Sequence, residues 1–203
     1  MGCFESLAVC MLSFVAFAGE MPKGLEGIRL GMTRVDLLSS RSNLEVGSAG
    51  STSTLLFDRS LANPLFSVAI FAFDNGELTR IVLERIATSS HVRSLCPAVL
   101  IDVNTALGVQ GVPMIGSIDS PGLPTIQYPA FVWTNRKARY TLRCIVSEDI
   151  VGRPNMIQLF IAGSSLQDAT NAKLRQPLSG DQQRLIERYT RHPQAGAGVF
   201  PNN

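Results

Sequence analysis

The chain has 203 residues, of which 17% are charged and 45% are hydrophobic, with a formal net charge of +2. This composition is typical of a globular protein and excludes intrinsic disorder over most of the chain, and the length favours one domain. So small a positive excess gives no argument for nucleic acid as a partner, and no nucleic-acid-binding motif is present.

The first segment with a recognisable function is the apolar run Leu7–Ala18, which ends in Ala16-Phe17-Ala18. An apolar run followed by an A-x-A pattern is typical of a secretory signal peptide, and the run is too short for a transmembrane helix, which needs about 20 apolar residues. We therefore expect export, either to the periplasm or to the extracellular space, after removal of residues 1–18. Three alternatives remain open: myristoylation at the M-G-x-x-x-S pattern that begins at Met1, a weak lipobox ending at Cys10, and a buried N-terminal helix.

The next elements are a helix and a hairpin. Thr33 and Asp36 predict a capping box that begins a short helix containing Leu37. Residues 46–54 predict a loop, and 55–57 a short strand. Phe66–Ile86 then predicts a β-hairpin that turns at Asn75-Gly76, because both residues tolerate the positive φ of a type I′ turn.

A two-residue turn would pair Asp74 with Glu77 and Phe73 with Leu78, and, in a regular ladder, Phe71 with Arg80 and Val68 with Leu83. One face of the hairpin would then be a core face, formed by Val68, Ile70, Ala72, Ile81 and Leu83. The opposite face would form an apolar strip of Phe71, Phe73 and Leu78, extended by Ala69 and Val82 and rimmed by Arg80 and Glu84. Such a strip is either a partner-binding patch or more core.

The second half of the chain predicts a helix over Ser89–Gly108. Its main part should begin at Pro97, after one looser turn, since proline is disfavoured inside a helix. Val109–Pro129 is rich in proline and glycine and predicts an ordered loop. Further expected elements are a hairpin over Phe131–Val146, a strand over Met156–Ala162, helices over Ser165–Arg175 and Asp181–Arg191, and a disordered tail at 192–203. Ser165 and Ser179 are the candidate N-caps of those helices. Together these elements predict one α+β domain over 19–191, with an antiparallel sheet of about six strands and helices packed on one face.

Two segments carry a resemblance to a known family. Gly31-Met32-Thr33 with Asp36 and Leu37 resembles the "GMT-x-x-(D/E)-(V/L)" helix start of the SmpA/OmlA-type outer-membrane-assembly lipoproteins, and Phe71–Leu78 is similar to their hairpin. Secreted β-lactamase-inhibitor domains share a similar helix-then-sheet plan. The resemblance implies a non-catalytic binding scaffold. Because the chain lacks the lipobox of those lipoproteins, it does not imply a membrane anchor.

Candidate chemistry is sparse. His91 could act as a general base for a serine, or it is a surface histidine beside a helix cap; His192 lies in the expected tail. Asp102 with Asn104, and Glu148 with Asp149, do not predict a metal site, and no cofactor motif is present. We expect a non-enzymatic binding protein of the envelope or secreted space; the alternative is a secreted hydrolase with an unidentified serine or carboxylate.

Two other groups of residues, a cysteine pair and a basic cluster, each allow two interpretations. Cys96 and Cys144 both lie on apolar faces and could form a disulfide in an oxidising compartment, or remain buried free thiols. A basic cluster on the expected second hairpin either keeps an edge strand soluble or binds an anionic partner, such as a lipid head group, a glycan or an acidic protein patch. It consists of Arg136, Lys137, Arg139 and Arg143.

Overall fold

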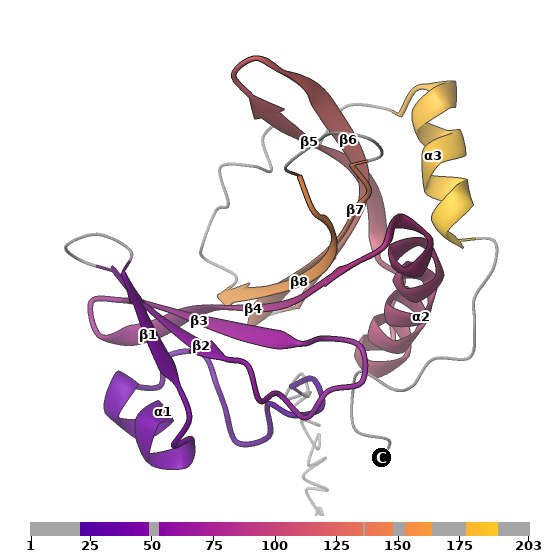
Figure 1. The fold of residues 1–203 in the computed structure, drawn as a ribbon. Helices are drawn as coiled ribbons and strands as arrows, with labels where there is room; N and C mark the ends of the chain where they lie inside the picture. Colours follow the sequence, from indigo (N-terminus) through magenta and orange to yellow (C-terminus); the bar gives the residue numbers. More distant parts are fainter. Residues whose placement is uncertain (1–20, 49–52, 136, 148–152, 164–177, 191–203) are drawn as a thin grey trace, which may run out of the picture.

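A computed structural model describes residues 21–48, 53–135, 137–147, 153–163 and 178–190 (Figure 1). The expected signal peptide and tail, the expected helix over Ser165–Arg175, and Arg136, Glu148 and Asp149 lie outside these residues. The described elements, in chain order, are α1 (Arg34–Ser40), β1 (Glu45–Ser48), β2 (Ser53–Asp58), β3 (Val68–Asp74), β4 (Glu77–Ala87), α2 (Ser89–Leu107), β5 (Val112–Ser120), β6 (Leu123–Thr134), β7 (Ala138–Ile145), β8 (Asn155–Gly163) and α3 (Gly180–Thr190).

The strands form one antiparallel sheet in the order β1-β2-β3-β4-β8-β7-β6-β5. The α+β class and the antiparallel sheet are confirmed, but the sheet has eight strands and not about six. The two additional strands are β1 and β5, which lie in the segments that we expected to be loops. β8 occupies the centre of the sheet and joins the N-terminal strands to the C-terminal ones through its pairing with β4 and β7.

The predicted loop over Val109–Pro129 is wrong: this segment forms β5 and the first half of β6, joined by a turn at Gly122, whose φ is 75°. Its prolines are compatible with strands because of where they lie. Pro113 is in β5, at the edge of the sheet. Pro124 and Pro129 precede Ala130, where the pairing of β6 with β7 begins, so one side of β6 has no paired strand there.

Helix α2 contacts β7 and β8, and α3 contacts α2, β5 and β6, so both lie beside the C-terminal half of the sheet (Figure 1). The expectation that the main part of α2 begins at Pro97 is wrong. The helix begins at Ser89, where the Thr88 side chain caps it by accepting from the His91 backbone N–H, and Pro97 lies buried in its interior. Gly108 ends the helix in the left-handed conformation, with a φ of 64°, as its position predicted.

The predicted capping box near the N-terminus is confirmed. Thr33 and Asp36 form the capping box of α1, and Leu37 of this helix is fully buried in the core. The segment before α1 is tied to the first hairpin, because the Gly31 N–H donates to the Leu78 carbonyl at 2.8 Å and the Leu78 N–H donates to the Met32 carbonyl at 2.9 Å.

None of the described helices is long and apolar enough to cross a membrane.

The first hairpin turns at Asn75-Gly76 as predicted, with φ values of 51° and 84°. Its register begins as predicted, with Asp74 opposite Glu77 and Phe73 opposite Leu78, but an irregularity between Ala72 and Phe73 then shifts the ladder by one residue. A β-bulge of this kind places two residues of one strand opposite one residue of the other and exchanges the faces beyond it. Phe71 consequently lies opposite Ile81, and Ala69 opposite Leu83.

Candidate functional site

The apolar strip of the first hairpin is core. Phe71 is 0% exposed, Phe73 3% and Leu78 1%, and all three belong to the main hydrophobic cluster together with Ile81 and Leu83. The predicted division of the two faces is therefore wrong, because the bulge brings residues that we had placed on opposite faces to the same side. Of the two interpretations that the sequence left open, the structure has the buried one, and these three side chains do not form an exposed patch.

Arg80 of the first hairpin and Arg139 and Arg143 of the second lie on the side of the sheet that faces away from α2. Cys144 of β7 points toward α2, to which it is covalently joined, and side chains alternate along a strand, so Arg139 and Arg143 point away from α2. On β8, Phe160 and Ala162 alternate with the fully buried Leu159 and Ile161. We define the arginine face as the part of this side formed by Arg80, Arg139, Arg143, Phe160 and Ala162.

The register places these residues in rows that run across three strands. Arg80 of β4 lies opposite Ala162 of β8, and Ala162 lies opposite Arg139 of β7. The sheet thus brings together one arginine from the first hairpin and one from the basic cluster, which are far apart in sequence. Adjacent strands lie about 4.8 Å apart, so the two arginine Cα atoms are separated by about 10 Å, with only a methyl group between them.

The third arginine stacks on an aromatic ring. Arg143 lies opposite Gln158, and its guanidinium carbon is 4.0 Å from the centroid of the Phe160 ring. Such a cation–π contact stabilises the position of the guanidinium by about 0.5–2 kcal/mol. Next to it, the Gln158 amide donates to the Glu84 carboxylate at 2.6 Å, so this carboxylate already has a hydrogen-bond donor.

The hydrogen bonding of Arg80 and Arg139 leaves donors available. The Nε of Arg139 is buried and has no hydrogen-bond acceptor. Within the described part of the chain, neither Arg80 nor Arg139 forms an ion pair with a carboxylate, whereas Arg41 pairs with the buried Asp58 and Arg59 with Glu45. A buried guanidinium N–H without an acceptor is costly, so this row has the capacity to take an anionic group.

The rest of the predicted basic cluster does not join this row. Lys137 is exposed in the turn between β6 and β7, where its backbone N–H donates to the Asn135 side chain at 2.9 Å, and Arg136 lies outside the described residues. Sequence reasoning missed Phe160 and Ala162. The alternation within Met156–Ala162 assigns them to one face, but only the pairing of β8 with both β4 and β7 shows that two arginines flank them.

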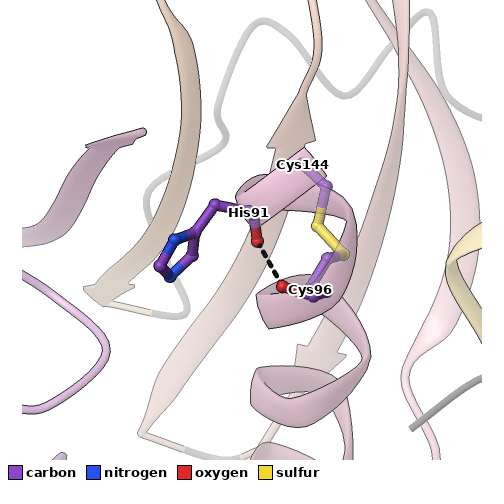
Figure 2. Close-up of a disulfide and its surroundings, with 4 residues drawn as sticks. His91, Cys96 and Cys144 are labelled. Carbon is purple, nitrogen blue, oxygen red and sulfur yellow. Dashed lines mark hydrogen bonds between the residues drawn. A yellow bond between two sulfur atoms is a disulfide. The ribbon is translucent and has the colours of Figure 1, made fainter. Parts of the chain in front are cut away.

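The disulfide between Cys96 and Cys144 is confirmed and joins α2 to β7 (Figure 2). Both cysteines are fully buried, which places the bridge in the core, where it has a structural role. Figure 2 also shows the imidazole of His91 pointing away from the bridge, while its carbonyl accepts from the Ser94 hydroxyl at 3.0 Å. His91 is exposed, which agrees with the surface interpretation of this residue.

Asn104 has a structural role in the fold. The Asn104 side-chain oxygen accepts from the Trp133 indole N–H and from the Gly111 backbone N–H, each at 2.9 Å, so this residue ties the end of α2 to the sheet. Among the described residues, no three histidine, cysteine or acidic side chains gather closely enough to hold a metal ion.

Shifted pKa values lie away from the arginine face. Burial raises the pKa of Tyr140 and of Tyr189 above 10.0. The pKa of Glu26 is lowered from 4.5, chiefly because its carboxylate accepts from the Gly24 backbone N–H at 2.9 Å. These shifts affect stability and give no indication of acid–base chemistry at the arginine face.

Comparisons with known proteins found no relative of this chain. No protein-family model, no curated protein and no solved structure matches the chain. The functional argument therefore rests on the residues and on their geometry.

Proposed function

We propose that this chain is an exported binding protein without catalytic activity, whose partner is a protein or another envelope component that presents negative charge to the arginine face. In this proposal the helices pack on the core face of the sheet, and the arginine face meets the partner. The observation that carries the proposal is the row of Arg80, Ala162 and Arg139, in which two arginines lie without a carboxylate partner in the described structure.

The electrostatic argument concerns local charge and not net charge. The chain as a whole is only weakly basic, at +2, so long-range attraction to a polyanion is weak. Three arginines on β4 and β7, the two strands that flank β8, nonetheless create a local positive field. Guanidinium groups suit carboxylate and phosphate because they donate two parallel hydrogen bonds. Recognition would accordingly be local and sensitive to salt.

Export is supported by the apolar run ahead of Gly19 and is compatible with the Cys96–Cys144 disulfide, since such bridges persist in oxidising compartments. The test is mass spectrometry of the protein recovered from its native host. An N-terminus near Gly19 or Glu20 is expected, and an intact Met1 or an acylated Gly2 would overturn this part of the proposal.

The binding proposal is tested by retention of the purified protein on immobilised polyanionic and neutral surfaces over a range of salt concentrations. The variant Arg80→Gln/Arg139→Gln/Arg143→Gln removes three charges from the arginine face. Its matched control, Arg29→Gln/Arg34→Gln/Arg59→Gln, removes three charges from exposed positions elsewhere. We expect the first variant to lose retention and the control to keep it. An equal loss of retention in both variants would show that retention depends on net charge alone and would overturn the proposal.

A further inference from the structure

We infer that the row formed by Arg80, Ala162 and Arg139 is a subsite for a phosphate monoester group, either free or carried on a lipid head group. This inference rests on the proposed function and makes it more specific, because it names the group that the arginine face recognises. It is carried by the placement of the three residues, by the lack of a carboxylate partner for either arginine among the described residues, and by the unpaired Nε of Arg139.

The first step concerns whether a ligand can reach both arginines. Arg80 and Arg139 are both partly exposed, so ligand can reach them, and the pairing of β4, β8 and β7 places them on either side of Ala162. A methyl group at position 162 leaves the guanidinium groups free to converge above it. A larger side chain at this position would occupy the space between the two arginine stems.

The second step concerns charge. Two guanidinium groups carry two positive charges. A phosphate monoester carries a charge of about −1.5 to −2 at neutral pH and offers three acceptor oxygens, so it matches both arginines. A single carboxylate carries one negative charge and would leave one guanidinium uncompensated.

The third step concerns the neighbours. Arg143 is stacked on Phe160, and the Glu84 carboxylate accepts from the Gln158 amide, so this acid already has a hydrogen-bond donor. On β8, Gln158, Phe160 and Ala162 point to the same side, and the Phe160 ring thus separates the Arg80–Arg139 row from Glu84. This separation keeps the charge of Glu84 away from the row.

The test is isothermal titration calorimetry of the full chain with inorganic phosphate, glycerol phosphate and acetate. We expect phosphate and glycerol phosphate to bind, acetate to bind more weakly, and Arg80→Gln or Arg139→Gln to weaken phosphate binding about tenfold or more, the effect of losing a charged hydrogen bond. Arg34→Gln is the matched control and should bind as the unaltered protein does. Vesicles of phosphatidic acid and of phosphatidylcholine distinguish the sources: retention on phosphatidic acid alone would identify a lipid head group.

Thermal unfolding of each variant checks that it folds, and Arg139→Lys serves as a second variant that keeps the charge but removes the guanidinium fork. A loss of phosphate binding in Arg139→Lys supports the subsite. No binding of phosphate or its ester, acetate binding as tight as phosphate binding, or phosphate binding that no arginine variant weakens would each overturn it. Retention on polyanions that still requires the three arginines, without phosphate binding, would overturn the subsite alone and leave the proposed function standing.

Discussion

Removal of the Cys96–Cys144 disulfide should destabilise the protein by about 4 kcal/mol. The bridge joins residues that are 48 positions apart, and closure of a loop of this length restricts the unfolded chain by about that amount in the chain-entropy model. Because small proteins are stable by only about 5–15 kcal/mol, the loss is a large part of the total. For a domain of this size it corresponds to a fall in Tm of roughly 8–16 °C.

The perturbation can be made in two ways. Reduction of the unaltered protein breaks the bridge without deleting atoms, whereas Cys96→Ala/Cys144→Ala also removes two buried sulfur atoms. Alanine suits these sites better than serine, because both are fully buried and a hydroxyl there would need a hydrogen-bond partner. Chemical denaturation with and without reductant gives the difference in unfolding free energy. Peptide mapping of the unreduced protein should recover a linked pair of peptides containing the two cysteines. Free thiols at both positions, or a difference below about 1 kcal/mol, would refute the reasoning.

Phe73→Ser should lower the unfolding free energy by about 3–5 kcal/mol, since the ring is buried in the core; an unchanged Tm would restore this side chain as a surface candidate. Asn104→Leu should cost at least about 1–3 kcal/mol, because it leaves the Trp133 indole N–H without its acceptor, and tryptophan fluorescence should shift. The raised pKa values of Tyr140 and Tyr189 mean that the folded state holds these protons more tightly than the unfolded state. The stability that these two protonated tyrosines contribute should therefore be fully present below pH 10 and be lost as the pH rises above it. Tyr140→Phe should make that fall shallower in pH-dependent denaturation; an unchanged slope would contradict the burial argument.

Local signals in the sequence predicted local structure well. Asn75-Gly76 predicted the turn and its first two residue pairs, and Thr33 with Asp36 predicted the start of α1. Ser179 caps α3 as predicted, since its hydroxyl accepts from the Gln182 backbone N–H at 3.4 Å. Each of these features depends on a few neighbouring residues whose conformational preferences agree with the fold.

Long-range features could not be predicted in the same way. The bulge between Ala72 and Phe73 has no sequence signal of its own, yet one inserted residue brings Ile81 and Leu83 to the same face as Phe71, and that face is the core. The composition of Val109–Pro129 favours a loop, and only its place at the edge of the sheet makes its prolines compatible with strands.

The candidate site shows the same limit. Arg80 and Arg139 were each singled out from the sequence, but as members of separate groups. Their proximity depends on the insertion of β8 between β4 and β7, a crossover that residue patterns do not determine. Ala162 between them carries no chemical signal at all, and its importance comes from its small size at that register position.

The central claim, that the arginine face binds an anionic group, is tested most directly by the NMR signals of the arginine Nε–H groups. Their chemical shifts report on the acceptor that each guanidinium meets, and the buried Nε of Arg139 has none in the structure. Addition of phosphate should shift the signals of Arg80 and Arg139 together, in a saturable manner, and leave the signal of the exposed Arg34 unchanged. Signals of Arg80 and Arg139 that do not move, or that move only as much as that of Arg34, would contradict the account.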